Sequence, residues 1–178
     1  MENFNQAISN ILNRKSVRKF LENKVEEDKI KQILEAAMAA PSAVNNQPWL
    51  FFVIDDRGLL DRLANELPYS KMLTTAPLAM VVCGDLELAS EGWEQEFWIQ
   101  DCSAATENIL LAVEALGLGA VWTAVYPSED RVEIVRNILN IPKNLMPLNV
   151  IPIGYPAANL HSQKKWDDSK INYNAWTN

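Results

Sequence analysis

Residues 41–49 read Pro41-Ser42-Ala43-Val44-Asn45-Asn46-Gln47-Pro48-Trp49, a polar loop between two apolar segments. Its prolines stiffen the backbone. Its three consecutive carboxamides supply both hydrogen-bond donors and acceptors. The apolar run Phe51-Phe52-Val53-Ile54 follows and predicts a buried strand. The stretch therefore predicts a stiff, polar loop that leads into the sheet of the protein.

Two helices are predicted upstream of this loop. The first covers Asn3–Asn13, where apolar residues recur at helical spacing, and the second opens with the acidic residues 26–28 and ends at Pro41. A basic island in an otherwise acidic chain lies between them: Arg14, Lys15, Arg18 and Lys19. Two interpretations of this island remain open, a solvated turn or a pocket for an anion such as a phosphate.

Further helices and strands are predicted downstream. Helices are expected at Leu59–Leu67, at Trp93–Leu116 with Gly117 as its C-terminal cap, and after Ser128 as an N-cap; strands are expected at Leu78–Cys83, Ala120–Tyr126 and Asn149–Ile153. Pro152 cannot donate to a sheet ladder, so its N–H side should be free or at an edge. Residues 157–178 form a polar tail. We expect a single domain over residues 1–178, an α/β or α+β sandwich.

Composition and charge argue against several classes of function. The net charge of −7 disfavours a nucleic-acid binder. No apolar stretch approaches the roughly 20 residues of a membrane span, and the N-terminus lacks the apolar region of a signal peptide, so a soluble cytoplasmic protein with no membrane partner is expected. Cys83 and Cys102 lack metal-site spacing, and the single histidine, His161, lies in the polar tail, which disfavours metal and hydrolase chemistry. The GxGxxG fingerprint of a Rossmann site is absent.

Four elements, in order along nearly the whole chain, resemble the nitroreductase family of flavoproteins. Residues 14–18 (Arg-Lys-Ser-Val-Arg) resemble its Arg-x-Ser-x-Arg/Lys element. Residues 41–49 match its Pro-Ser-x-x-Asn-x-Gln-Pro-Trp element at every fixed position, and this match is the most specific. Residues 100–111 and 115–119 resemble its long-helix signature, and Ile153-Gly154-Tyr155-Pro156 matches its late element.

The resemblance implies an α+β fold with a central, mostly antiparallel sheet of four to five strands flanked by helices, in an interlocked homodimer. It implies FMN bound between the subunits, with the tail (residues 157–178) packed on the partner subunit. Hydride would pass from NAD(P)H through the flavin to a small-molecule acceptor, such as a nitroaromatic, a quinone or another conjugated electrophile. This two-step, ping-pong reaction needs no catalytic side chain, because the cofactor carries the chemistry.

The resemblance also assigns residues to the cofactor. Arg14 and Ser16 would hold the phosphate and ribityl chain, and Arg18 would lie near the ribityl and pyrimidine side. The phosphate is a dianion, which guanidinium, ammonium and hydroxyl groups suit. Residues of the loop would reach the flavin of the other subunit, the backbone at 123–125 would border the ring, and one of two tail lysines would complete the phosphate site. The implied cofactor-binding set is Arg14, Lys15, Ser16, Arg18, Pro41, Ser42, Asn45, Gln47, Lys71, Thr123, Ala124, Val125, Lys164 and Lys165.

Structural interpretations stand beside some of these assignments. The tail lysines are equally explained as solvated residues, and Asn45 and Asn46 as turn formers. Trp49 is expected in the core. The aromatic side chains of residues 93, 97 and 98 would either line a substrate pocket or belong to the core or dimer interface.

Two other functions remain open at this point. One is a flavin-dependent dehydrogenase or dehalogenase specific for one metabolite, with residues 85–98 as a lid over the substrate. The other is a non-catalytic protein that stores or senses FMN.

Overall fold

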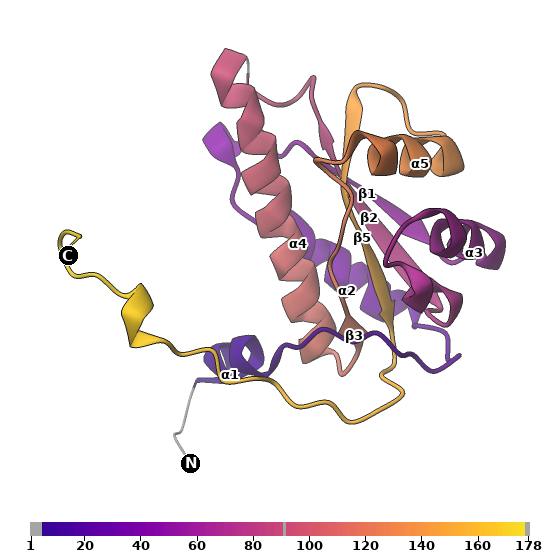
Figure 1. Cartoon of the computed structure of the whole chain (residues 1–178), viewed down its shortest axis with the longest axis horizontal. Coiled ribbons are helices and arrows are strands. Elements are labelled where there is room, and N and C mark those ends of the chain that lie inside the picture. Colours follow the sequence, from indigo (N-terminus) through magenta and orange to yellow (C-terminus); the bar gives the residue numbers. More distant parts are fainter. Residues whose placement is uncertain (1–4, 91, 177–178) are drawn as a thin grey trace.

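The computed structural model describes residues 5–90 and 92–176, and these are built around a five-stranded sheet (Figure 1). The strands are β1 (Trp49–Ile54), β2 (Leu78–Asp85), β3 (Gly119–Ala120), β4 (Thr123–Ala124) and β5 (Leu145–Gly154). Their order is β1-β2-β5-β3, and β4 also pairs with β5. Every pairing between these strands is antiparallel, which confirms the sheet that the resemblance implied.

Helices cover both faces of this sheet (Figure 1). On one face lie α2 (Glu27–Met38) and α4 (Phe97–Ala115), and on the other lie α3 (Arg57–Glu66) and α5 (Glu129–Leu139). Successive strand residues point to opposite faces. Met80 and Val82 of β2 accordingly pack with α2 and α4, whereas Val81 and Cys83 pack with α3 and α5. The result is an α+β sandwich with a separate apolar core on each side of the sheet.

The single strand predicted at Ala120–Tyr126 is wrong, because the structure splits it into β3 and β4. The two pieces keep one register on β5, since Ala120 pairs with Ile153 and Thr123 pairs with Val150. The gap between them faces Pro152 and its neighbour, and proline has no N–H to donate to a ladder. Pro152 therefore lies in a central strand, not at an edge, and the ladder beside it is interrupted. This interruption frees residues 121 and 122 to line a pocket.

Other predicted elements differ mainly at their ends. Strand β1 is the sheet edge, so Leu50 and Val53 are exposed and the expected buried strand is only half buried. The long helix predicted from residue 93 begins as a short 3₁₀ helix, η3 (Gly92–Glu96), before α4. Gly117 follows α4 with a φ of 72°, the left-handed conformation of the predicted cap. Ser128 occupies the N-cap position of α5, but its side chain makes no capping hydrogen bond.

Two segments carry apolar side chains that the rest of the chain leaves exposed. In α1 (Gln6–Asn13) no residue is buried, and Ile8, Ile11 and Leu12 are about half exposed. The predicted helix also included residues 3 and 4, which lie outside the described residues. The described part of the tail runs away from the body of the protein in an extended path (Figure 1), and Trp166 and Tyr173 are 78% and 83% exposed. Both segments thus carry apolar side chains that the described residues of the chain leave uncovered.

Across residues 5–90 and 92–176, no helix has the length and apolar character needed to cross a membrane. The same residues contain no cluster of three or more His, Cys, Asp or Glu side chains that would hold a metal ion.

Candidate functional site

The basic element near the N-terminus forms a strap (residues 14–21) that lies along β3. Ser16 forms a parallel bridge with Ala120, and the backbone N–H of Val17 donates to the Ala120 carbonyl at 2.9 Å. The Val17 side chain is buried and packs closely on Gly119, where an added Cβ would lie 2.6 Å from a Val17 methyl. Because side chains alternate along an extended segment, Ser16 and Arg18 face outward and are exposed.

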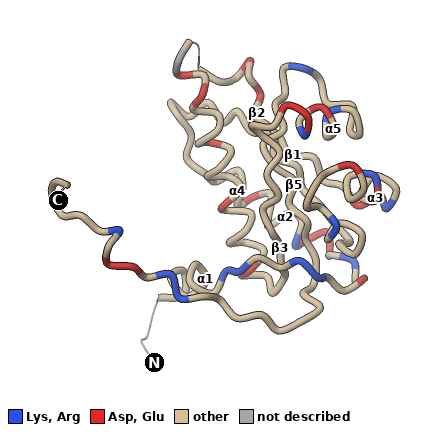
Figure 2. Tube along the Cα trace, viewed as in Figure 1, with Lys and Arg blue, Asp and Glu red and all other residues tan. Residues whose placement is uncertain are grey.

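Figure 2 shows the strap as a segment rich in Lys and Arg, and its four cations differ in their ion-pair partners. Arg14 lies 3.5 Å from the Glu107 carboxylate of α4, and Lys15 donates to Glu114 at 2.8 Å. Arg18 forms no ion pair with any described residue. The strap therefore holds two cations against α4, whereas Arg18 and Lys19 have no ion-pair partner among the described residues.

Arg18 lines a pocket of about 250 Å³, named the Arg18 pocket here. Its wall includes Thr123 and Ala124, two of the residues expected to border the ring, while their neighbour Val125 is buried. Lys71 is exposed at the start of the 3₁₀ helix η2 (Lys71–Thr74), next to a pocket-lining methionine. The full lining is Arg18, Pro68, Tyr69, Met72, Val121, Trp122, Thr123, Ala124 and Arg131.

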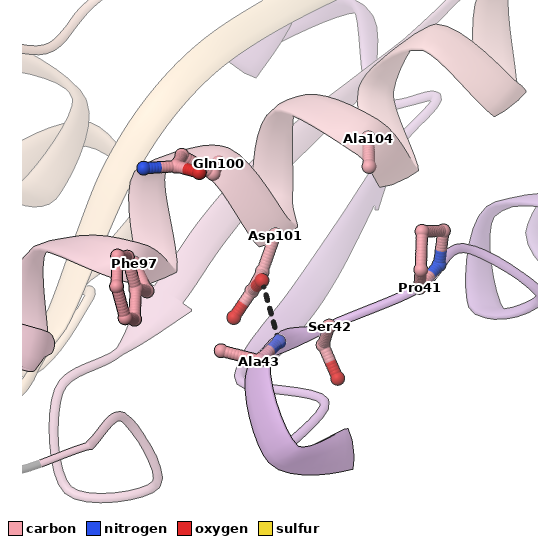
Figure 3. Close-up of a pocket in the computed structure, with 7 residues that line it drawn as sticks. All are labelled: Pro41, Ser42, Ala43, Phe97, Gln100, Asp101 and Ala104. Carbon is pink, nitrogen blue, oxygen red and sulfur yellow. Dashed lines mark hydrogen bonds between the residues drawn. The ribbon is translucent and has the colours of Figure 1, made fainter.

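The loop at residues 41–48 is held by its own polar side chains. The Ser42 hydroxyl accepts from the Gln47 backbone N–H at 2.9 Å, and the Gln47 amide donates to the Asn45 side chain at 2.9 Å. Val44, Asn45 and Gln47 have positive φ values, which side-chain-bearing residues rarely adopt. The buried Asp101 carboxylate of α4 accepts from the Ala43 N–H at 2.9 Å and ties the loop to that helix (Figure 3).

A second cavity of about 390 Å³, the Ser42 pocket, lies between this loop and the first turns of α4 (Figure 3). Phe97, Gln100 and Ala104 face it from the helix. Pro41, Ser42 and Ala43 face it from the loop. An aromatic ring, a carboxamide and small side chains are a lining suited to a flat ligand of mixed polarity.

Within one chain, the two pockets lie toward opposite ends of α4. Asp101 contacts the loop, whereas Glu114 binds the strap. With a rise of 1.5 Å per residue, these positions are about 20 Å apart along the helix axis. One chain therefore gathers Arg14, Ser16 and Arg18 with Thr123 and Ala124, and it gathers Pro41, Ser42, Asn45 and Gln47 separately. Lys164 and Lys165 are exposed in the tail, and neither forms an ion pair with a described residue.

The structure also decides between interpretations of the aromatic residues. Trp49 is buried, as predicted. Trp98 is buried too and meets Tyr126 edge to face with ring centroids 5.1 Å apart, so it belongs to the core. Phe97 lines the Ser42 pocket. The side chain of residue 93 lies outside what the structure describes.

The two cysteines are not candidates for chemistry. Burial raises the pKa of the Cys83 thiol to about 12, and burial also raises the pKa of the Cys102 thiol. Both thiols therefore stay protonated, and a protonated thiol is a poor nucleophile and metal ligand.

Sequence reasoning predicted Arg18, Thr123 and Ala124 among the nine residues that line the Arg18 pocket. It missed the other six, including Tyr69 and Arg131, and it did not foresee the role of Asp101. Arg131 follows two acidic residues at the start of a helix, and a charge run of this kind is ordinarily a solvated surface. Its place in the pocket depends on how α5 packs beside β4, which no local pattern reveals.

The comparisons with known proteins agree with this geometry. The family model described as "Nitroreductase family" matches residues 11–67 and 59–155. A relative from Methanothermobacter thermautotrophicus, named "Putative NADH dehydrogenase/NAD(P)H nitroreductase", is 46% identical over 93% of this chain and 85% of its own length. A crystal structure of the same description from Bacteroides thetaiotaomicron is 50% identical, with a TM-score of 0.93 over 98% of this chain and all of that one.

A second similar structure is described as a complex with a ligand. It is "a putative nitroreductase in complex with fmn" from Desulfovibrio desulfuricans, 29% identical, with a TM-score of 0.83 over 98% of this chain and all of that chain. The family model covers well over half of the sequence, and the relatives match along nearly its full length. The chain therefore belongs to the nitroreductase family.

Proposed function

We propose that this protein is an NAD(P)H-dependent FMN oxidoreductase whose cofactor site is completed by a second copy of the chain. The observation that carries this proposal is that the predicted cofactor-binding residues fall into two separate groups within one chain. The strap with the Arg18 pocket and the loop with the Ser42 pocket lie about 20 Å apart along α4. A second copy that brings its loop to the strap of the first would join the two halves. The FMN and NAD(P)H named for the relatives support the cofactor and the electron donor.

The residues of the strap fit FMN. Arg14 and the Ser16 hydroxyl supply a cation and a donor for the phosphate, and Lys15 adds positive potential although it is already bound to Glu114. The lining of the Arg18 pocket contains two guanidinium groups and no acidic side chain, as an electron-rich pyrimidine edge requires. Lys71 lies beside this pocket, and Thr123 and Ala124 line it.

In the proposed dimer, the loop and the tail of the partner subunit supply the remaining contacts to the cofactor. Asn45 and Gln47 are tied to each other and offer their remaining donors and acceptors outward, while Pro41 and Ser42 line the Ser42 pocket. The exposed apolar residues of α1 and of the tail supply the surface that a stable dimer buries. We place the tail on the partner subunit, where Lys164 or Lys165 reaches the phosphate.

Bound FMN supplies the redox chemistry by taking a hydride from the nicotinamide and giving it to the acceptor. The overall reaction with a quinone consumes NAD(P)H, one proton and the quinone, and it yields NAD(P)⁺ and the hydroquinone. Donor and acceptor occupy the same face in turn, so ping-pong kinetics are expected. The protein binds and orients the two substrates and excludes water, with Phe97 and Gln100 on the wall where a flat acceptor stacks.

Because the donor is a cytosolic metabolite, we place the enzyme in the cytoplasm, and cell fractionation checks this.

The first test is an absorbance spectrum of the purified protein, followed by anaerobic addition of NADH and then of NADPH. Oxidised-flavin peaks that bleach rapidly support the proposal, and the preferred donor is read from the rates. A protein that is colourless and takes up no added FMN contradicts it. The matched variants Arg14→Met and Arg62→Met distinguish the loss of a cofactor contact from the loss of a surface charge. Arg62 serves as the control because it is a half-exposed residue of α3 paired with Glu66. Only Arg14→Met should weaken FMN binding.

Acceptor kinetics then test the substrate class. Turnover with both a quinone and a nitroaromatic, with parallel lines in double-reciprocal plots, supports a broad two-step oxidoreductase. Turnover with one metabolite alone would favour the specific dehydrogenase or dehalogenase instead. Flavin that only dithionite reduces would indicate a protein that stores or senses FMN.

A further inference from the structure

The Arg18 pocket contains a second guanidinium group, from Arg131 in the first turn of α5. One of its nitrogens, Nη1, donates to the Ala124 carbonyl at 3.1 Å. The guanidinium carbon lies 5.9 Å from the centre of the Tyr69 ring, within the range of a cation–π contact. A strand carbonyl and an aromatic face therefore hold the cation at the rim of the pocket.

The charge of this pocket is unusual for the chain. The sequence contains six arginines, and four of them lie within ion-pair distance of a carboxylate: Arg14, Arg57, Arg62 and Arg136. Among the described residues, Arg18 and Arg131 have no such partner, and both line this one pocket. In a protein with a net charge of −7, two uncompensated cations beside one cavity indicate a site for an electron-rich group.

Tyr69 supports the same interpretation. Its ring is 82% exposed, so burial does not explain its position. Its backbone has a φ of 61°, a left-handed conformation that is strained for an aromatic residue. The strained backbone places the ring against Arg131, which points to a role in positioning the cation.

We propose that Arg131, positioned by Tyr69, binds the pyrimidine end of reduced FMN more tightly than that of oxidised FMN and so raises the reduction potential of the cofactor. The proposal rests on the function proposed above. Oxidised flavin has a neutral ring, whereas addition of two electrons and one proton leaves an anion at the pyrimidine end. A fixed cation there stabilises the reduced form selectively. Arg18 contributes from the strap, and Arg131 contributes from α5 on the other side of the pocket.

The test compares Arg131→Met, Arg131→Lys and the control Arg62→Met. The dissociation constant of oxidised FMN and the anaerobic midpoint potential are measured for each. We expect Arg131→Met to bind oxidised FMN nearly as well as wild type, but to bind reduced FMN at least tenfold more weakly. By the thermodynamic cycle, a tenfold loss lowers the two-electron potential by about 30 mV. Arg131→Lys should show a smaller drop, and Arg62→Met none.

The pH dependence of the potential separates a charge effect from a structural one. A two-electron, one-proton couple falls by about 30 mV per pH unit, and a two-proton couple falls by about 60 mV. Near neutral pH, wild type should follow the shallower slope, and Arg131→Met should move toward the steeper slope because its reduced flavin holds a proton to higher pH.

The outcomes distinguish this inference from the proposed function. If wild-type protein binds no FMN, the proposed function fails, and the inference fails with it. If all variants bind FMN and Arg131→Met keeps the wild-type potential and slope, the inference alone is overturned. Should Arg131→Met not fold by circular dichroism, Arg131→Lys and Tyr69→Leu decide: a lowered potential in both supports the inference, and unchanged potentials overturn it.

Discussion

Asp101 is the side chain on which the geometry of the Ser42 pocket most directly depends. Its buried carboxylate accepts from the Ala43 N–H at 2.9 Å, which joins the loop to α4. In Asp101→Ala that N–H loses its partner, and a hydrogen bond to a charged group contributes about 1.5–3 kcal/mol. We expect the free energy of unfolding to fall by about this amount in urea denaturation, and we expect weaker FMN binding because the loop is no longer fixed.

Asp101→Asn provides the matched control, because its side-chain carbonyl still accepts from Ala43. It should lose less stability than the alanine variant and keep most of the affinity for FMN. If alanine and asparagine variants bind FMN equally well, the hydrogen bond does not position the loop.

Tyr155 forms a surface cluster with Glu26 and Lys29. Its single O–H donates to the Glu26 carboxylate, whose two oxygens both lie at 2.8 Å, and the hydroxyl oxygen accepts from Lys29 at 2.7 Å. The hydrogen bond from Tyr155 lowers the pKa of Glu26 below 4.5, and the one to Tyr155 raises the pKa of Lys29 above 10.5. The Glu26 contribution to stability is therefore present above pH 4.5 and is lost as pH falls through the lowered pKa. The Lys29 contribution is present below pH 10.5 and is lost as pH rises through the raised pKa.

Tyr155→Phe tests this linkage. Its urea midpoint should lie below that of wild type by the largest margin between pH 5 and pH 10, because both charged partners gain from the hydroxyl there. The margin should narrow as pH falls below 4.5 and through the lowered pKa of Glu26, because the protonated carboxyl no longer gains from the hydroxyl as a charged acceptor. A margin that does not change with pH would mean that the hydroxyl acts only through packing. The groups are exposed, so the expected effect is small.

At the scale of single residues, the sequence predicted those site groups that belong to short, continuous motifs. Arg14, Ser16 and Arg18 were recognisable because they lie within five positions, and the structure places them together on the strap. Tyr69 and Arg131 meet Arg18 only through the packing of separate elements. Their chemistry was invisible in the sequence because a lone tyrosine or arginine has no local signature.

Among the elements, the strap depends on the absence of a side chain at residue 119. A Cβ there would lie 2.6 Å from a Val17 methyl, closer than real Cβ contacts. In Gly119→Ala the strap must move off β3, or β3 must shift, and overpacking of this kind costs about 1–3 kcal/mol. We expect lower stability and weaker FMN binding, measured by urea denaturation and by flavin fluorescence.

Gly58→Ala is the comparison for that variant. Residue 58 is in α3, where alanine is favoured over glycine, and an added Cβ would approach only the end of the Asp56 side chain at 3.1 Å. Its FMN affinity should equal that of wild type. If Gly119→Ala also binds FMN normally, the close packing of the strap does not determine the site.

Apolar periodicity was sufficient to predict which helices and strands exist. It could not predict where a strand is interrupted, because that depends on the residue that faces it in the neighbouring strand. The helices α2, α3, α4 and α5 and the strands β2 and β5 follow the predicted segments. The strand expected at 120–126 breaks because the facing residue on β5 is a proline. This pairing is set by the tertiary structure and is not visible in the local sequence. The same break brings Trp122 to the pocket wall. A local pattern could not show that the sheet is interrupted at the site.

At the scale of the whole molecule, the single chain has more apolar surface than its own core covers. The side chains of α1 and of the tail remain exposed although the two faces of the sheet are well packed. The dimer proposed above accounts for both the divided site and this exposed surface, because a second copy of the chain would cover the apolar residues and supply the missing half. Dimerisation and FMN binding should therefore be linked, so that FMN raises the thermal midpoint of the dimer.

A variant that ends at Pro156 tests the role of the tail. The described tail residues, 157–176, are all exposed, so their loss should leave the sandwich folded by circular dichroism. If the tail packs on the partner, the truncated protein should show a weaker dimer by light scattering over a concentration series, and its affinity for FMN should fall at least tenfold. This loss combines the missing interface with the missing tail lysines.

Two full-length variants separate these causes. Replacing Trp166, Ile171 and Tyr173 by serine removes the apolar contacts but keeps both lysines, and it should weaken the dimer. Replacing Lys164 and Lys165 by methionine keeps the apolar contacts, and it should weaken FMN binding while the dimer persists, because the phosphate loses a charge-assisted partner. A truncated protein that remains a dimer with wild-type affinity for FMN would show that the tail belongs neither to the interface nor to the phosphate site.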